Sequence, residues 1–588
     1  MSTQAVTEFL GRFDAVVAAG QLPTAEKMLD EMLAEHPGND DLLYRKFRVQ
    51  NAQGLHDQAF VTSLSLSSQL KANAGVNFQI LVTLPRVRSI PTNAAVEAEL
   101  CRILAIEGLD CQPIWHIVAG FFKRRLAASR TGGDFLGALS RNDLFNATLR
   151  NFPLWDAALE QECISIRQQL LELSVSDPDR AGDCERLLLS IAMQCFQNEY
   201  VYYTDAAEAA TVGQLRSEFD AGGVSAGAPN KRSRLIAHVL LMYVPPAEVF
   251  GSKSLSPETS AALGRELVEF VRFFLNEQAL IRRYADEFLA QAGDTDEATA
   301  KIAALYDSNP YPRWTKGPLN LNVQNRSYAE LFGLESCPGW RDEPGAEQRK
   351  MLVAGCGTGR HPTISAVFFP GLDVFGIDIS ASCLAYARMM AERMGLSNMR
   401  FAIGDIMRLD EWTEKFDIIE CMGVLHHLDD PEAGLANLVG LLAPGGIIKL
   451  GYYSEAAREN ISRLRSERPP QGDKTDRDYV REIRHKLFTD PAYRQYADIA
   501  ELGDFYSLSG ASNVLLHEHE VRYSIPRLQQ VLDDQGLQFL SFIDEAKPRF
   551  AAAGGQGSPF NLMNWAPLEE QDPKFFAGMY EFYCQKKA

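Results

Sequence analysis

Three features are missing from this sequence of 588 residues. It has no run of about 18 apolar residues, the length that a helix needs to cross a membrane. It has no charged-then-apolar leader of the kind that directs export. Its 10 cysteines show no CxxC spacing, which argues against a disulfide framework or a cysteine zinc site. We therefore expect a cytoplasmic protein with reduced thiols, no membrane contact and no metal.

Basic residues are also fewer than acidic ones. The chain has 58 Lys and Arg against 77 Asp and Glu, a formal net charge of −19. Because a nucleic-acid backbone needs a basic face, we expect no nucleic-acid partner. A hydrophobic content of 46% and a charged content of 23% are ordinary for globular protein. The length is too great for one hydrophobic core and indicates about two to four domains.

The stretch from 350 to 450 organises the rest of the chain. An apolar run before Gly355 reads as a buried strand, and Gly357 and Gly359 follow at alternate positions. Glycines spaced in this way let the backbone turn sharply and let a ligand approach closely. A second apolar run ends in Asp378, about twenty residues past the turn, the offset at which nucleotide-binding units grip a ribose. This pattern predicts a nucleotide-like ligand.

Further apolar runs continue the pattern. One reaches Gly-Asp at 404–405, one runs from Phe416 to a His-His pair at 426–427, and one follows Pro-Gly-Gly at 444–446. Helical patterns separate these runs, which indicates an alternating α/β domain with its site residues at strand ends. Two late apolar runs, 538–543 and 579–584, predict two further strands.

Taken in order, these features resemble the class I S-adenosylmethionine-dependent methyltransferases over roughly residues 315–588. The resemblance implies a Rossmann-like, seven-stranded α/β sheet in which the last strand is antiparallel. The nearest rival is a nicotinamide or flavin Rossmann domain. Its GxGxxG fingerprint requires a third glycine at position 360, where this sequence has Arg360.

The resemblance also implies a binding site for S-adenosyl-L-methionine. In it the glycine turn lies against the amino acid part and the ribose, Asp378 accepts both ribose hydroxyls, and Asp405 accepts from the adenine amino group. The cofactor-binding residues implied in this way are Gly355, Gly357, Gly359, Asp378, Ile379, Asp405, Ile406 and Met422. Helix capping is the alternative role for both aspartates.

Candidate catalytic residues stand at the ends of the fourth and fifth strands. A general base is needed only if the acceptor arrives protonated. The candidates are His426, His427, Tyr452 and Tyr453, and of these we select His427 and Tyr453. In the family the His-His turn is often structural, and that alternative stays open.

The insertion after the fifth strand, about 455–523, is unusually long, and we expect a helical cap over the strand ends. Tyr506 and His519 in it are candidate substrate contacts. His517 and His519 have no third or fourth ligand at metal-site spacing, so we expect no metal there.

The N-terminal half has a helical pattern. Gly20 and Ala25 recur as Gly54 and Ala59 with a shift of 34, the period of the tetratricopeptide hairpin repeat. We therefore predict tetratricopeptide-like hairpins at 1–75, with an ordinary helical hairpin as the alternative. Residues 76–303 are predicted to form an all-α helical domain.

A joint at 304–317 precedes the methyltransferase domain, which we predict to span 318–588. Its sequence NPYPRW resembles that of bacterial proteins that join tetratricopeptide repeats to a methyltransferase. Our hypothesis is that Tyr306, Tyr311 and Arg313 pack over the methionine end of the cofactor. The alternative is a linker that ties the helical half to the sheet.

These features predict an S-adenosylmethionine-dependent methyltransferase that acts on a protein side chain presented by the helical half. A homodimer is the candidate assembly. Two alternatives remain. One is a small-molecule O-, N- or C-methyltransferase of a secondary pathway. The other is an interaction scaffold that binds the cofactor without turnover.

Overall fold

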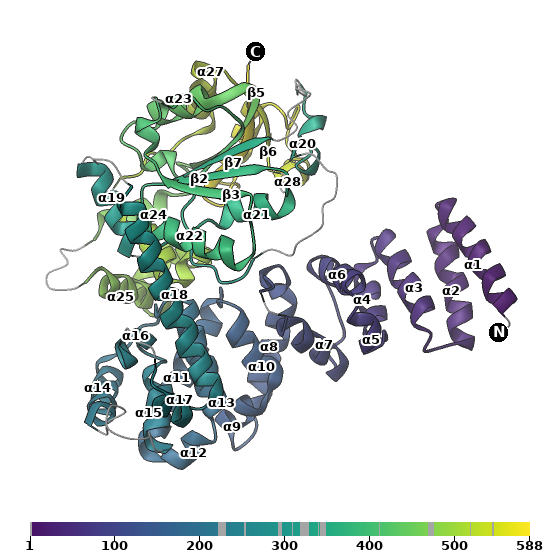
Figure 1. Ribbon diagram of the computed structural model, residues 1–588. Helices are drawn as coiled ribbons and strands as arrows, with labels where there is room; N and C mark the ends of the chain where they lie inside the picture. Colours follow the sequence, from purple (N-terminus) through teal and green to yellow (C-terminus); the bar gives the residue numbers. More distant parts are fainter. Residues whose placement is uncertain are drawn as a thin grey trace. The chain divides into compact units, whose positions relative to one another are not determined.

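The computed structural model describes residues 3–106, 108–221, 231–251, 255–291, 297–308, 310–317, 328–338, 340, 349–410, 412–468, 475–517, 519–543 and 546–587. The chain forms two compact units (Figure 1). The first comprises Met1–Phe152 with Asp183–Ile191, and the second comprises Pro153–Gly182 with Ala192–Ala588. The boundaries predicted at 75 and 303 lie inside these units and stay predictions.

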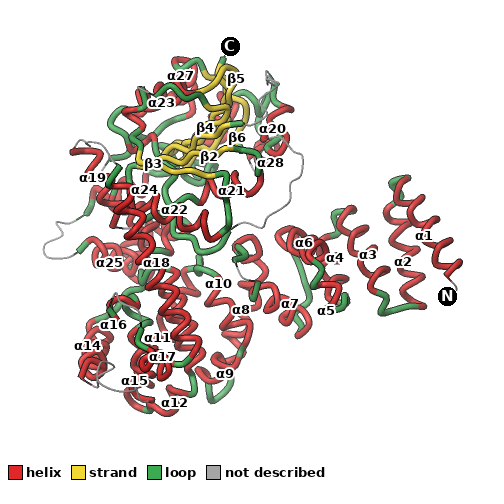
Figure 2. The backbone as a smooth tube through the Cα atoms, in the orientation of Figure 1, coloured by secondary structure: helices red, strands yellow, loops and turns green. Residues whose placement is uncertain are grey.

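The first unit is built from successive helices (Figure 2). They are α1 (Thr3–Ala18), α2 (Leu22–Glu35), α3 (Asp40–Ala52), α4 (His56–Leu64), α5 (Ser68–Lys71), α6 (Ala74–Thr83), α7 (Ala94–Leu104), α8 (Trp115–Arg130), α9 (Phe135–Arg141) and α10 (Asp143–Asn151). Gly20 and Gly54 both adopt positive φ values (71° and 76°), and Ala25 and Ala59 are both fully buried. The predicted repeat therefore has equivalent turns and equivalent small core residues, although its assignment as tetratricopeptide stays a prediction.

The second unit begins with further helices, so the expected helical N-terminal half is confirmed. They are α11 (Ala157–Ser176), α12 (Pro178–Gly182), α13 (Glu185–Gln197, which starts in the first unit), α14 (Ala206–Ala221), α15 (Lys231–Leu240), α16 (Pro246–Phe250), α17 (Pro257–Leu263), α18 (Arg265–Leu289) and α19 (Glu297–Ser308). After α13, Glu199 and Tyr200 both adopt the left-handed conformation with φ of 61°. A helix cannot continue through such residues.

A seven-stranded sheet forms the centre of the second unit, in the order β3-β2-β1-β4-β5-β7-β6. Its strands are β1 (Lys350–Ala354), β2 (Asp373–Asp378), β3 (Met399–Ile403), β4 (Phe416–Met422), β5 (Leu442–Tyr453), β6 (Leu537–Phe542) and β7 (Met579–Lys586). Neighbours from β3 to β5 pair in parallel, whereas β7 pairs antiparallel with both β5 and β6. The expected fold, with an antiparallel last strand, is confirmed.

Alternating side chains cover both faces of the sheet. In β1, Leu352 packs in one core and Val353 in the other, as the period of two in a strand requires. The first face carries α23 (Pro431–Leu441) and α27 (Ile525–Asp534). The other carries α20 (Tyr328–Leu331), α21 (Arg360–Phe368) and α22 (Ala381–Arg393), and α18 packs along α22.

The Pro-Gly-Gly segment differs from its expected place before the fifth strand. It lies inside β5, where the register with β4 shifts between Phe416 and Ile418. Gly445 adopts a φ of 70° there. Such a conformation is characteristic of a glycine in a bulge, so the strand starts earlier than the sequence indicates.

The insertion after β5 forms α24 (Glu459–Ser466), α25 (Asp476–Thr489) and α26 (Leu508–Leu516) together with two 3₁₀ segments, η6 (Pro491–Glu501) and η7 (Gly503–Tyr506). Helix α25 begins where the side chain of Thr475 accepts a hydrogen bond from the N–H of Asp478, a usual N-cap. The remaining helices are α28 (Ala546–Ala552) and α29 (Ala566–Gln571). Short 3₁₀ turns occur elsewhere: η1 (Leu84–Arg86), η2 (Gln112–Ile114), η3 (Leu334–Ser336), η4 (Ile406–Arg408), η5 (Leu425–His427) and η8 (Leu562–Trp565). Within the described ranges, no helix is long and apolar enough to span a membrane.

Candidate active site

A cavity of about 610 Å³ lies at the carboxyl ends of β1, β2, β4 and β5. In a sheet of this topology the crevice outside the strand ends is the expected ligand site, and the volume is typical for a small-molecule ligand. All its lining residues belong to the second unit, between Ile302 and Glu581. They come from the strand ends, the joint and the cap insertion.

The glycine turn forms one wall. Gly355 and Gly357 line the cavity, and a Cβ on Gly357 would lie 2.7 Å from the carbonyl oxygen of Tyr311. Gly359 does not line the cavity; it precedes α21 with a φ of 82°, and a Cβ there would lie 2.6 Å from Cβ of Ala387. The first two glycines therefore shape the cavity wall, and the third permits the close approach of the glycine turn to Ala387 of α22.

Asp378 ends β2 with its carboxylate at the cavity. The backbone N–H of Gly357 donates to Oδ2 at 2.8 Å, and that of Ser380 donates to Oδ1 at 2.9 Å. Burial raises the pKa of Asp378, and these backbone donors oppose the rise. Each oxygen keeps a lone pair for a further donor, so the carboxylate is placed to accept two ligand hydroxyls.

The next part of the cavity has apolar walls and a second carboxylate. Ile379, Ile406 and Asp405 line it, and Met422 lines it from the end of β4. Oδ1 of Asp405 also accepts a hydrogen bond from the N–H of Met407 at 2.9 Å. Asp405 thus caps a 3₁₀ turn and lines the cavity, so the two roles foreseen for it are not exclusive.

The joint covers the glycine turn. The carbonyl of Tyr311 accepts from the N–H of Thr358 at 3.3 Å, and its hydroxyl donates to Oδ1 of Asp504 at 2.8 Å. Tyr306 donates to Oδ1 of Asn513 at 3.1 Å and lies 2.9 Å from Nε2 of His517. Tyr306, Tyr311, Asp504 and Asn513 all line the cavity. The joint and the cap therefore close the site together.

Among the described residues, one ring nitrogen of His427 has a hydrogen-bond partner and the other has none. Its Nδ1 lies 3.1 Å from the carbonyl oxygen of His519, while its Nε2 is buried without a hydrogen-bond partner. A carbonyl only accepts, so in the neutral ring the proton is on Nδ1 and Nε2 carries a lone pair. Burial, followed by the nearby imidazoles of His426 and His517, lowers the pKa of His427 well below its ordinary value. His427 is therefore neutral at pH 7 and lines the cavity as a potential base.

Tyr453 is clamped on both faces. The ring of His426 stacks on it with centroids 3.6 Å apart, and the guanidinium of Arg458 lies 3.5 Å from its centroid. Tyr453 lines the cavity, and with both faces covered only its edge and hydroxyl remain available to a ligand.

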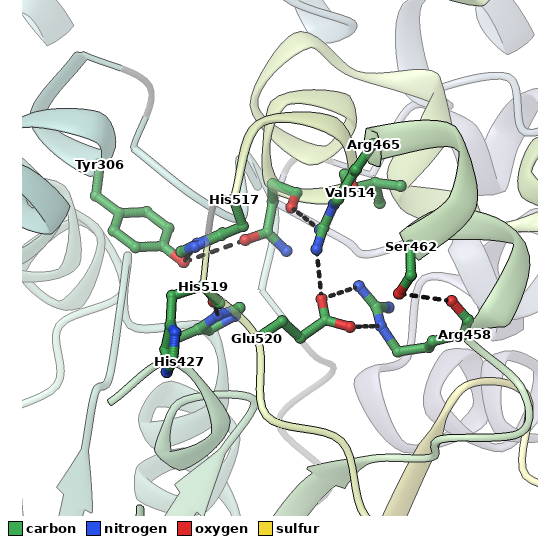
Figure 3. Close-up of polar contacts among 10 residues, drawn as sticks. Tyr306, His427, Arg458, Ser462, Arg465, Val514, His517, His519 and Glu520 are labelled. Atoms are coloured by element: carbon green, nitrogen blue, oxygen red, sulfur yellow. Dashed lines mark hydrogen bonds and ion pairs between the residues drawn. The ribbon is translucent and has the colours of Figure 1, made fainter. Parts of the chain in front are cut away.

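Arg458 is held in turn by Glu520 (Figure 3). Two hydrogen bonds of 2.8 Å join Arg458 to Glu520, and Arg465 adds a third contact at 2.7 Å. Although burial acts in the other direction, the hydrogen bond from Arg458 and the charges of both arginines lower the pKa of Glu520 to about 2. This ion-pair cluster fixes the cap wall beside Tyr453.

Comparisons with known proteins agree with this geometry. Residues 347–487 match the family model described as a methyltransferase domain. An uncharacterized protein of Synechococcus sp. is 31% identical over 284 residues, which cover 46% of this chain and 66% of that protein. A ubiquinone biosynthesis O-methyltransferase of Coxiella burnetii is 36% identical over 98 residues, 17% of this chain and 41% of the enzyme. The matches thus span less than two thirds of these relatives.

The chain contains a class I S-adenosylmethionine-dependent methyltransferase domain. Among solved structures, PKMT2 from Rickettsia typhi in complex with AdoHcy is 20% identical with a TM-score of 0.34, over 47% of this chain and 56% of that one. A magnesium protoporphyrin IX methyltransferase from Synechocystis with bound SAM is 11% identical with a TM-score of 0.25, over 50% of this chain and all (100%) of the other.

The cofactor of this methyltransferase domain is S-adenosyl-L-methionine, and the residues present fit it. The paired carboxylate oxygens of Asp378, the apolar walls of Ile379 and Ile406, and the open glycine turn supply partners for ribose, adenine and the amino acid part. No group of three or more His, Cys, Asp or Glu able to hold a metal occurs in the part of the chain that the structure describes.

Three of the predicted contacts lie outside the cavity. Arg313 pairs with Glu277 at 2.8 Å and covers the ring of Phe196 at 4.3 Å. Tyr506 is buried in the cap and donates to the carbonyl of Ala500 at 2.7 Å. The exposed ring of His519 lies 3.1 Å from the carbonyl oxygen of Leu428. None of the three lines the cavity, although the backbone of His519 orients His427.

Sequence reasoning missed several residues at the acceptor end. Asp504, Arg458 and Asn513 line the cavity, and Glu520 holds Arg458. All four belong to the cap insertion. Its length predicted a cap, but the pattern within it did not show which side chains face inward.

Proposed function

We propose that this protein transfers the methyl group of S-adenosylmethionine to a side chain of a protein acceptor, with His427 as the general base. The observation that carries the proposal is the free Nε2 of His427, buried at the cavity, while Nδ1 faces the carbonyl oxygen of His519. Because Nε2 is itself buried, the proposal requires the His427 ring to shift so that this lone pair meets the acceptor at the strand ends.

The cofactor, when bound, supplies a methyl group on a positively charged sulfur, which is a good leaving group. The protein must then align the acceptor and remove its proton. Nε2 of His427 takes the proton, and the carbonyl of His519 stabilises the resulting imidazolium through Nδ1–H. Tyr453, fixed between His426 and Arg458, limits the orientation of the acceptor.

A protein acceptor is supported by the first unit. None of the cavity-lining residues belongs to it, so its helices remain available to hold a partner. Stacked helical hairpins commonly bind peptides or proteins. A small-molecule acceptor is the second candidate, because a relative in part of the domain is named a ubiquinone biosynthesis O-methyltransferase.

The test is transfer of radiolabelled methyl groups from S-adenosylmethionine into a lysate, separated into protein and small-molecule fractions. Label in a protein band is the expected result. Label only in the small-molecule fraction favours the second candidate. Cofactor binding without label in either fraction indicates a scaffold.

His427→Gln tests the assigned base in the same assay. We expect a rate about 10²- to 10⁴-fold lower, with cofactor binding retained. His485→Gln is the matched control, because His485 lies on α25, stacks on Tyr203 and does not line the cavity. An unchanged rate in His427→Gln contradicts the role of His427.

A further inference from the structure

Asp504 is a carboxylate of the cavity that has no role in the proposed methyl transfer. It lies in η7 of the cap and lines the cavity. Its side chain is exposed, so a ligand in the cavity can reach it. The hydroxyl of Tyr311 donates to its Oδ1 at 2.8 Å. A single neutral donor leaves most of the accepting capacity of a carboxylate unused.

The positive charges near Asp504 do not neutralise it. Arg458 lines the same cavity but makes two hydrogen bonds to Glu520, which Arg465 also contacts. Burial raises the pKa of Asp504 despite the hydrogen bond from Tyr311 and the charges of Arg458 and Arg360. A carboxylate in this condition is stabilised by a cation that enters the cavity with hydrogen-bond donors of its own.

We propose that Asp504, oriented by Tyr311, is the alkylammonium site of this cavity. A primary ammonium group provides one positive charge and three N–H donors, which match the free lone pairs of the carboxylate. Two sources have this chemistry: the α-ammonium group of the cofactor and an amine on the acceptor. The inference rests on the proposed function only for the second source.

The first arm of the test compares two ligands that differ in the amino acid portion. S-adenosylhomocysteine carries the α-ammonium group, and 5′-methylthioadenosine lacks it; both have a neutral sulfur. If the cofactor is the source, Asp504→Asn lowers the affinity for S-adenosylhomocysteine about 10- to 100-fold, the range for a charged hydrogen bond. Titration calorimetry measures this affinity. The affinity for 5′-methylthioadenosine then stays unchanged.

The second arm uses the protein saturated with S-adenosylhomocysteine. It is titrated with butylammonium chloride, and with 1-butanol as the neutral ligand of similar size. If an acceptor amine is the source, the wild-type protein binds butylammonium more tightly than butanol, and Asp504→Asn removes this preference. Glu501→Gln is the matched control, since Glu501 is an exposed cap carboxylate outside the cavity.

A loss of affinity in Asp504→Asn that is confined to the ammonium ligand of either arm supports the ammonium site and identifies its source. Equal weakening of charged and neutral ligands shows that Asp504 acts only through the structure of the cap and overturns the inference. Unchanged affinity in both arms also overturns it. Because both arms measure binding, absence of methyl transfer would contradict the proposed function while leaving this inference intact.

Discussion

The imidazole rings of His427 and His517 stack with centroids 3.8 Å apart and an interplanar angle of 14°. His427 follows β4, and His517 follows α26 of the cap. The stack therefore joins the sheet to the cap at the acceptor end of the cavity. Two uncharged imidazoles tolerate this contact, whereas two imidazolium ions repel each other.

The free energy of unfolding should fall as the pH drops below the pKa of histidine in the unfolded chain. Burial, followed by the charge of Arg465, lowers the pKa of His517 to about 4, and burial lowers the pKa values of His426 and His427 well below the ordinary 6.5. Between the folded and unfolded values the unfolded chain binds more protons, so the free energy of unfolding rises with pH. The contribution of these histidines to the free energy of unfolding is therefore complete above about pH 6.5. It is lost on acidification toward pH 4.

Chemical denaturation at several pH values measures this effect. The groups that face the stack also include Arg458, Arg465 and Glu520, and they are ionised throughout this range. His517→Asn should give a shallower dependence of the unfolding free energy on pH, since one proton-binding group is removed. An identical slope in the variant and the wild type contradicts the assignment.

Asp378→Asn should weaken S-adenosylmethionine binding by about 1.5–3 kcal/mol, the range for hydrogen bonds to a charged group. The amide keeps the size of the side chain but offers only one accepting oxygen. Asp373→Asn is the control, because Asp373 begins β2 and contacts Arg400 at 3.7 Å, away from the cavity. Calorimetry that gives equal affinities for the two variants contradicts the ribose role of Asp378.

Arg313→Ala should destabilise the fold, with little effect on the cofactor affinity of the folded protein. Arg313 is paired with Glu277, whose side chain is 0% exposed, and Arg393 is the second partner of Glu277. Removal of one partner of a buried pair costs about 3 kcal/mol or more. This expectation replaces the cofactor contact that the sequence suggested for Arg313.

Arg388→Ala, on the same helix as Arg393, is the comparison for that loss. The side chains of Arg388 and its partner Glu287 are 37% and 44% exposed, so we expect a loss of about 1 kcal/mol or less. Urea unfolding compares the two variants. Equal losses, or a cofactor affinity that falls only in Arg313→Ala, would disagree with the position of Arg313.

Gly359→Ala should destabilise the protein more than Gly395→Ala. Both glycines have positive φ values, 82° and 67°, but only Gly359 would place a Cβ 2.6 Å from another atom, Cβ of Ala387. The left-handed conformation costs an alanine about 1 kcal/mol at either position. Overpacking at Gly359 adds about 1–3 kcal/mol. Thermal unfolding with equal shifts for both variants would refute the close approach of Gly359 to Ala387 of α22.

The sheet and the cofactor end of the site could be predicted because their signals are local. Glycines at alternate positions, and Asp378 at the end of an apolar run, report backbone turns and strand ends directly. The acceptor end depends on contacts between residues far apart in the chain. Tyr311 meets Asp504 across 193 positions, and no periodicity in either segment encodes that pairing.

Arg313 shows why residue type was insufficient. A positive side chain in an aromatic segment beside the site suits a ligand carboxylate, yet the same chemistry suits a buried glutamate. The partner, Glu277, lies in the middle of α18, and its burial follows from the packing of α18 along α22. The prediction of Tyr506 and His519 had the same weakness, because the inward side of the cap is set by tertiary packing.

Titration calorimetry of the purified chain with S-adenosylmethionine tests the central claim most directly. We expect saturable heat with one site per chain, strongly reduced in Asp378→Asn. A folded wild-type protein that gives no binding heat with S-adenosylmethionine or S-adenosylhomocysteine at several temperatures would contradict it.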